Sequence, residues 1–196
     1  MFSIETIRRR LHDKKVGIAG SGGLGSNCAM ALARAGIGHL VLTDLDIVEE
    51  SDLAVQYYFQ DQIGQKKVLA LSDNVKKVNP QIKTETHDIK LDENSIVTIF
   101  RNCDVIVEAF TLVEAKQMLV ETVLLNFPEK YLIMSSGLAR WGDSNKISQA
   151  SYEKLIICGD FISGAKETLP PLAPRVGIVS NMQANAVLEV LLNKNF

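Results

Sequence analysis

A glycine-rich loop between an expected strand and an expected helix is the feature of this 196-residue sequence that most restricts its fold. Residues 15–19 (KVGIA) form a short apolar run, residues 20–25 read GSGGLG, and apolar residues then recur at helical spacing. Gly20 permits a tight turn, Gly22 lets the backbone approach a phosphate, and Gly25 lets the helix pack closely on the strand. This order of elements predicts a βαβ unit of the dinucleotide-binding type.

Strands and helices are expected to alternate along the rest of the chain. Residues 44–61 lose any periodicity and predict a long loop with a helical turn at 57–59. The other patterns predict helices at 4–12, 68–78, 96–101 and 113–125, and strands at 39–43, 82–87, 105–107 and 131–135. Such alternation implies right-handed crossovers. We therefore expect an α/β fold with a doubly wound, Rossmann-like, mostly parallel sheet, helices on both faces and a C-terminal helix.

A single domain is expected over residues 1–196, because about 150 residues per domain is usual. Its first part, residues 1–12, is the N-terminal helix, and residues 13–135 form the Rossmann-like core. Residues 136–196 hold strand pieces at 146–148 and 155–158 and a final helix with Pro174 in its first turn.

Charge and cysteine usage exclude several classes of partner. Lys and Arg number 21 against 23 Asp and Glu, a net charge of -2, so no basic field is available for nucleic acid or an anionic membrane. No apolar stretch reaches the roughly 20 residues of a bilayer span. Cys28, Cys103 and Cys158 form no CxxC pair, so we expect no zinc, buried thiols and a cytoplasmic protein.

Two acidic residues follow the second expected strand. Asp44 stands at its end, where a carboxylate can accept the hydroxyl hydrogen bonds of a ribose. Asp46 could serve ribose or metal, or could be a solvated loop residue. By itself, this combination of loop and carboxylate indicates an NAD-dependent oxidoreductase.

The residues around the loop point elsewhere, because the chain resembles the ThiF-type sulfur carrier protein adenylyltransferases. Their superfamily includes the molybdopterin-synthase activator MoeB and the ubiquitin-activating enzymes. The shared motifs are GSGGLGS (20–26), ARAGIG (33–38), DLDIVE (44–49), SDLAVQYYF (51–59), IGQKK (63–67) and VNP (78–80). Four further motifs resemble the short thiamine-pathway branch of the superfamily in particular: EAF (108–110), SSGLARWGDSNKI (135–147), ICGD (157–160) and LAPRV (172–176).

This resemblance implies an enzyme that uses ATP and Mg2+ to adenylylate the C-terminal Gly-Gly carboxylate of a ubiquitin-like sulfur carrier of the ThiS type in thiamine biosynthesis. It implies Lys67 as the catalytic lysine acting on the triphosphate, although a solvated helix lysine is the alternative, and it leaves the metal ligands unknown. The implied nucleotide-binding residues are Gly20, Gly22, Gly23, Gly25, Asp44, Asp46, Gln56 and Lys67. Members of this superfamily form dimers, and the first helix of this chain carries an apolar stripe with little else to cover it. We therefore expect a homodimer.

Several positions depart from the family pattern. The family segment SNLNRQ reads SDLAVQ at residues 51–56, so Val55 replaces an arginine and Asp52 replaces an asparagine. Thr111 stands where the family has a metal-binding aspartate; Glu108 or Asp46 could compensate, but a polar strand-end residue is the simpler interpretation of Glu108. A catalytically weakened paralogue that binds nucleotide or carrier is therefore a second hypothesis, beside the NAD-dependent oxidoreductase.

Overall fold

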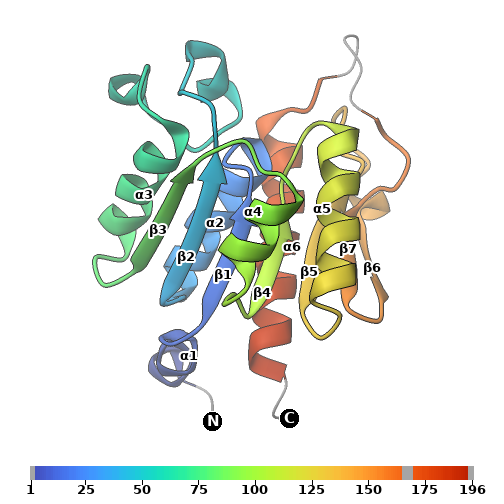
Figure 1. Ribbon diagram of the computed structural model, residues 1–196. Helices are drawn as coiled ribbons and strands as arrows, with labels where there is room; N and C mark the ends of the chain where they lie inside the picture. The colour runs from blue at the N-terminus through green and yellow to red at the C-terminus, as the bar shows by residue number, and fades with distance from the viewer. Residues whose placement is uncertain (1–2, 165–169, 194–196) are drawn as a thin grey trace.

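A seven-stranded sheet forms the centre of the protein (Figure 1). The computed structural model describes residues 3–164 and 170–193. The strand order is β3-β2-β1-β4-β5-β7-β6, and of the strands in these described ranges only β6 runs antiparallel to its neighbour. The strands are β1 (Lys15–Ala19), β2 (His39–Asp44), β3 (Lys83–Asp88), β4 (Val105–Glu108), β5 (Tyr131–Ser136), β6 (Ser148–Tyr152) and β7 (Leu155–Gly159). The expected doubly wound, mostly parallel sheet is confirmed.

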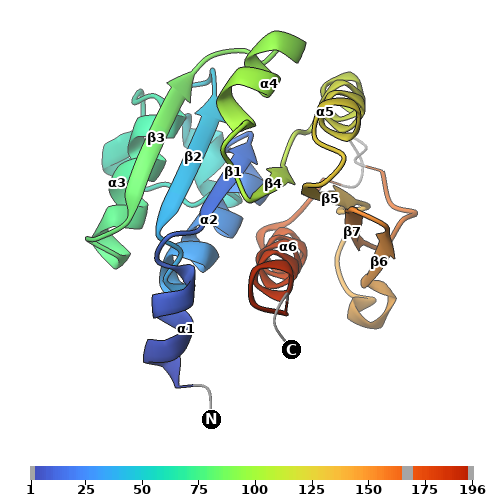
Figure 2. The same ribbon diagram turned by 60° about the horizontal axis from the view of Figure 1, so that its bottom comes forward.

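Helices cover both faces of this sheet (Figure 2). One face carries α2, α3 and α6, and the other carries α4 and α5. The helices are α1 (Ile4–Leu11), α2 (Gly23–Ala35), α3 (Lys67–Val78), α4 (Glu93–Phe100), α5 (Val113–Asn126) and α6 (Ala173–Asn193). Successive strand residues point to opposite faces, so Leu40 and Leu42 join the core beneath α2 while Val41 joins the core beneath α4. The central strands are therefore buried on both sides, as their continuous apolar runs require.

Three expected elements lie elsewhere in the structure. The helical turn expected at 57–59 is wrong: two 3-10 turns, η1 (Glu50–Ala54) and η2 (Gln60–Gln62), flank that position. The strand expected at 146–148 is also wrong, because η3 (Ser144–Lys146) occupies its start and the polar edge strand β6 follows. Helix α4 begins three residues before the expected Ile96, because the Asp92 carboxylate accepts the Ser95 N–H at 2.7 Å and caps the helix.

The first helix lies beyond the amino ends of the strands, near the end of α6 (Figure 1). Its residues Ile7 and Leu11 pack on the core, and the Arg10 guanidinium donates to the Leu192 carbonyl at 2.9 Å. Only Ile4 of its apolar stripe is exposed, at 72%. The expectation of an uncovered stripe is therefore wrong, since the chain itself covers most of it.

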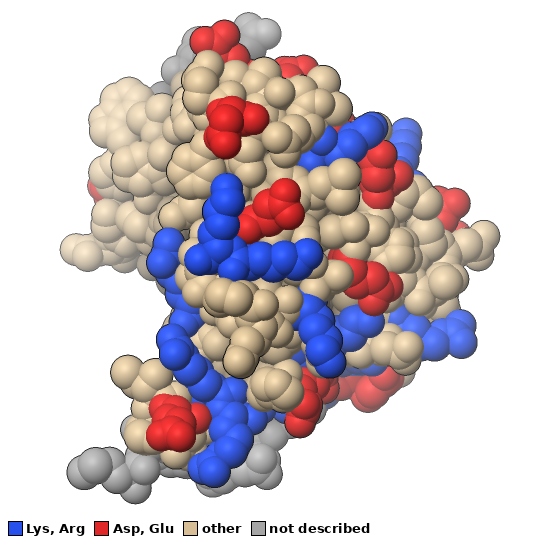
Figure 3. All heavy atoms as spheres, turned by 90° about the vertical axis from the view of Figure 1, so that its left-hand side faces the viewer, with Lys and Arg blue, Asp and Glu red and all other residues tan. Residues whose placement is uncertain are grey.

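Charge of both signs is interspersed on the face that includes α3 and β3 (Figure 3). Two ion pairs contribute to this mixture: Lys66 lies 3.2 Å from Asp88, and Lys15 lies 2.7 Å from Glu85. None of the helices in the described part of the chain combines the length and apolarity that a bilayer crossing requires.

Candidate functional site

Two adjoining cavities open at the carboxyl ends of the parallel strands. The first, here called the β2 cavity, has a volume of about 560 Å³ and is lined by Gly20, Asp44, Asp46 and Lys67 among others. The second, the β5 cavity, has a volume of about 460 Å³ and extends over the loops after β5 and β7. Both are lined by Gly23, Gln56, Ala109, Phe110 and Thr111. The strand order reverses between β1 and β4, and ligands of such sheets bind at that switch point.

The glycine loop adopts a conformation that only glycine fits at two positions. Gly20 has φ +98°, and a Cβ there would lie 2.9 Å from the Ala109 carbonyl oxygen. A Cβ on Gly25 would overlap the carbonyl oxygen of Gly20. Helix α2 therefore starts directly against the end of β1, and its first amide groups have no acceptor within the helix.

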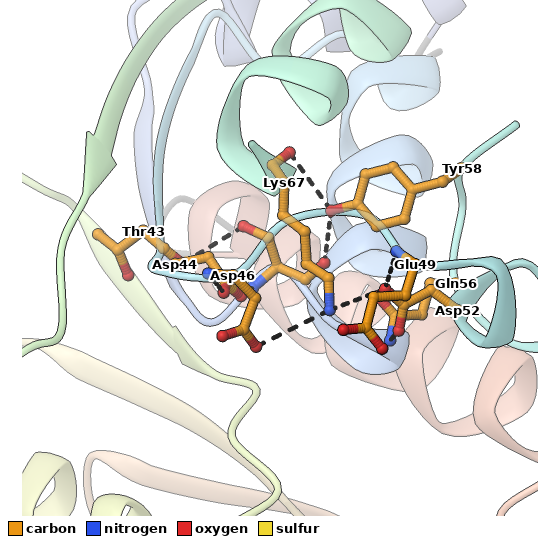
Figure 4. A network of polar contacts seen from close by, with 9 residues as sticks. Thr43, Asp44, Asp46, Glu49, Asp52, Gln56, Tyr58 and Lys67 are labelled. Atoms are coloured by element: carbon orange, nitrogen blue, oxygen red, sulfur yellow. Dashed lines mark hydrogen bonds and ion pairs between the residues drawn. The ribbon is translucent and has the colours of Figure 1, made fainter. Parts of the chain in front are cut away.

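Asp44 holds this loop in place. Its Oδ2 accepts the Ser21 N–H at 2.6 Å and its Oδ1 accepts the Asp46 N–H at 2.9 Å (Figure 4). The buried Tyr58 hydroxyl donates to the Ser21 carbonyl at 2.6 Å. Burial, and then the negative charges of Asp44 and Asp52, raise the pKa of Tyr58 well above its usual value, so the phenol remains a donor. Asp44 thus lines the β2 cavity with both oxygens fixed.

Lys67 lies inside the site and is not a solvated helix lysine. It begins α3, its side chain is 8% exposed, and its N–H donates to the Asp46 carbonyl at 3.0 Å. Its Nζ lies 3.1 Å from Asp52 Oδ2 and 3.9 Å from Asp46 Oδ2 (Figure 4). The neighbouring Lys66 is exposed by comparison. The lysine implied by the resemblance is therefore present, already paired with carboxylates.

Val55 and Thr111, which depart from the family pattern, and Gln56, which follows Val55, differ in burial and in their contacts. Val55 packs against the core and approaches the start of α2, where a Cβ on Gly23 would lie 3.2 Å from its Cγ1. Thr111 is exposed and lines both cavities. Gln56 donates from Nε2 to Asp52 Oδ1 at 2.6 Å, while its Oε1 is buried without a hydrogen-bond partner.

Glu108 does not compensate for the missing aspartate. Its side chain is fully buried and accepts from Lys116 Nζ at 2.8 Å and from the Phe110 N–H at 2.6 Å. It does not line either cavity. Among the described residues, no group of three or more His, Cys, Asp or Glu side chains is placed to hold a metal ion.

A buried ion pair to which sequence reasoning assigned no role lies behind the wall of the β5 cavity, next in sequence to the lining residue Val176. Asp160 follows β7, Arg175 lies in the first turn of α6, and their charged groups lie 2.5 Å apart with side chains 1% and 3% exposed. Arg175 also donates to the Gly142 carbonyl at 2.6 Å. Burial alone would raise the pKa of Asp160, but hydrogen bonds from Ser163, Ile162 and Arg175 outweigh it and hold the pKa well below its usual range. The motifs ICGD and LAPRV contain both residues, but sequence separation hid their pairing.

The cysteines are buried, as expected. Burial is the main cause that raises the pKa of the Cys158 thiol to about 11, and it raises that of Cys103 to about 12. A thiol in such surroundings forms little nucleophilic thiolate at neutral pH. Cys158 is therefore a core residue, as its apolar sequence context predicts.

The fold and the glycine loop define a Rossmann-type α/β protein with its cavities at the switch point. The sequence pattern of the ThiF family matches residues 2–196, and the chain belongs to that family. It is 30% identical over 198 residues to the adenylyltransferase and sulfurtransferase MOCS3 of Caenorhabditis briggsae, covering 93% of this chain and 47% of that protein. It is 28% identical to the SAMP-activating enzyme E1 of Haloferax volcanii, covering 93% and 63%. The chain spans about half the length of the curated relatives it matches first.

Solved structures share the fold. The tRNA N6-threonylcarbamoyladenosine dehydratase TcdA of E. coli, in complex with ATP, superposes with a TM-score of 0.87 at 18% identity, covering 97% of this chain and 90% of that one. E. coli MccB with ATP gives a TM-score of 0.73 at 20% identity, covering 94% of this chain and 57% of that one. At these identities the likeness establishes the fold.

The Asp160–Arg175 pair predicts a pH-dependent stability difference. Asp160→Asn leaves the buried guanidinium without a carboxylate, so we expect a loss of about 3–5 kcal/mol in unfolding free energy at pH 7. Because the folded-state pKa is lowered, this contribution is complete above the ordinary value near 3.9 and is lost as pH falls through the folded-state value. Urea unfolding of wild type and variant from pH 7 to pH 2 should show the difference narrowing below about pH 4. Equal stabilities at pH 7 would contradict this assignment.

Proposed function

We propose that this protein uses ATP to adenylylate a carboxyl group of a ubiquitin-like carrier. The observation that carries the proposal is the convergence of the glycine loop, Asp44 and Lys67 on the β2 cavity, with a second cavity directly beside it. The names of the relatives support this chemistry, since they are adenylyltransferases and activating enzymes. TcdA and MccB, which share the fold, have been crystallised with ATP.

In this proposal, adenosine occupies the β2 cavity. The remaining lone pairs of Asp44 accept ribose hydroxyls, and the phosphates lie along Gly20–Gly25 at the amino end of α2. Gln56, Asp46 and Lys67 complete the nucleotide contacts, with Lys67 nearest the triphosphate. The β5 cavity would receive the C-terminal tail of the carrier, because it shares the wall at Gly23 with the nucleotide.

The reaction joins two anions. A carboxylate oxygen of the carrier attacks the α-phosphorus, a carbon-oxygen-phosphorus linkage forms, the bond to the β-phosphate breaks, and pyrophosphate leaves. Magnesium bound to ATP supplies positive charge that offsets the repulsion between the reactants. The protein contributes the helix amino end and Lys67, and it holds the reactants in adjoining cavities.

The finer assignment to thiamine biosynthesis, with a carrier of the ThiS type ending in Gly-Gly, rests on the motifs at 108–110, 135–147, 157–160 and 172–176. Membership of the ThiF family disfavours the NAD-dependent oxidoreductase that the glycine motif alone indicates. A catalytically weakened paralogue remains the second candidate. Three residues favour it. Val55 supplies no positive charge for the phosphates, Thr111 supplies no carboxylate for a metal ion, and Asp52 forms an ion pair with Lys67.

Nucleotide binding tests the role of Asp44. Asp44→Ala should weaken adenine nucleotide binding about ten- to a hundredfold, because a charge-assisted ribose contact is lost. Isothermal titration with ATP, ADP and NAD, with and without magnesium, measures the effect and distinguishes the cofactors. Asp13→Asn, an exposed change far from β2's carboxyl end, serves as the control. An unchanged dissociation constant for Asp44→Ala would remove this residue from the site.

Pyrophosphate exchange into ATP tests turnover. With magnesium and a carrier ending in Gly-Gly, Lys67→Ala should reduce the exchange rate about a hundred- to a thousandfold, since a preorganised charge contact is removed. Robust exchange that does not respond to this change would contradict the assigned mechanism.

The same assay separates the weakened paralogue from the enzyme. A weakened protein should show no wild-type exchange, and the double change Val55→Arg with Thr111→Asp should raise it by adding the phosphate cation and the carboxylate together. If the double variant gains nothing, these two positions do not explain the lack of activity.

A homodimer is the expected assembly, by family resemblance and because closed two-fold pairs are the commonest oligomers. The stripe on α1 supplies little of the interface, since Leu11 is buried in its own chain. Apolar residues elsewhere on the surface offer alternatives, including Leu112, Val113, Leu125 and Ile162. Light scattering at micromolar concentration should give about twice 21.6 kDa, and the monomer mass would refute pairing.

A further inference from the structure

We propose that Asp52 competes with nucleotide phosphate for Lys67, and that it thereby weakens the preference of the β2 cavity for nucleotides with more phosphates. The inference rests on the proposed nucleotide site, and it goes further by giving one residue control over which adenine nucleotide binds. A site with this pair should favour ATP over AMP much less than the same site without the carboxylate.

Asp52 is held as a fixed anion by contacts to both of its oxygens. Oδ1 accepts from Gln56 Nε2 at 2.6 Å, and Oδ2 accepts from the Glu49 N–H at 2.9 Å and faces Lys67 Nζ at 3.1 Å (Figure 4). The side chain is 12% exposed. An anion fixed by a backbone donor, an amide and an ammonium group is placed much as a bound phosphate oxygen would be.

The pair lies where the two cavities meet. Lys67 lines the β2 cavity and Asp52 lines the β5 cavity, while Gln56, which contacts Asp52, lines both. A ligand that spans the cavities beside Gln56 lies next to this pair. A phosphate that reaches Lys67 therefore shares the ammonium group with Asp52 or displaces that carboxylate from it.

The surrounding charges do not offset this competition. The acidic residues lining the β2 cavity are Asp44, Asp46 and Glu114, against Lys67 and the exposed Lys90. Val55, where an arginine would add a second cation, is packed against the core. Each additional phosphate brings more negative charge towards a cation that is already neutralised, so added phosphates gain less affinity than an unpaired lysine would give them.

Asp52→Asn isolates the charge from the shape. The asparagine keeps one oxygen for Lys67 and the Glu49 N–H, and its amide can face Gln56, whose own amide can rotate to meet it. The variant therefore removes one negative charge at nearly constant volume. Asp52→Ala removes the same charge together with the contacts, and it serves as a second variant.

The experiment is a titration of wild type, Asp52→Asn, Asp52→Ala, Lys67→Met and the double variant Asp52→Asn with Lys67→Met. ATP, ADP and AMP are titrated in the presence of EDTA and again with magnesium, and thermal melting checks folding. Asp61→Asn is the matched control, because Asp61 is exposed in η2 and lines neither cavity. Pyrophosphate exchange is measured in parallel on the same proteins.

In EDTA, Asp52→Asn and Asp52→Ala should tighten ATP binding about tenfold and AMP binding less than about threefold, with ADP between them. The Lys67→Met background should abolish this gain, because the competition acts through the ammonium group. Equal gains for all three nucleotides, no gain, or a gain that persists without Lys67 would overturn the role of Asp52 while leaving the nucleotide site intact. Failure of wild type and both Asp52 variants to bind any adenine nucleotide would overturn the proposed function and this inference together.

Discussion

The close approach of Gly25 to the carbonyl of Gly20 is the constraint on which the rest of the site depends. It brings the amino end of α2 directly against the end of β1, and a methyl group at Gly25 would separate them. Once this contact is made, the Ser21 N–H reaches Asp44 on the neighbouring strand. Tyr58, from the long loop after β2, then fastens the same turn through the Ser21 carbonyl. Backbone geometry thus sets the positions of the charged side chains.

The elements that could be predicted are those whose signal is local. The apolar runs of β1 and β4 identify strands buried on both faces, and the glycine loop identifies the first crossover. The turns after β2 were not predicted, because η1 depends on reciprocal hydrogen bonds between Glu49 and Asp52. In this capping box the side chain of each residue accepts from the backbone N–H of the other. Strand β6 was not predicted because it is an edge strand whose residues are mostly polar and exposed. Its sequence therefore lacks the apolar residues that mark a strand facing the core.

The candidate site was predictable in residue type but not in its internal pairing. Asp44 and Lys67 both line the expected cavity, as spacing and resemblance indicated. The contact between Asp52 and Lys67 joins residues from η1 and α3, and that between Asp160 and Arg175 joins β7's end to α6. Such pairs depend on how loops fold back over the sheet edge, which the periodicity of the sequence does not encode.

The placement of α1 and of the far end of α6 has a practical consequence. Helix α1 and the far end of α6 lie beyond the amino ends of the strands (Figure 1). Arg10 joins them by donating to the Leu192 carbonyl, while both cavities open at the opposite, carboxyl edge of the sheet. Attachment through α1 or through the far end of α6 directs a tag, a fluorophore or an immobilising surface away from the cavities, whereas the start of α6 lines the β5 cavity at Val176. The protein can therefore be tethered by this end for single-molecule or surface-based measurements with its openings turned towards the solution.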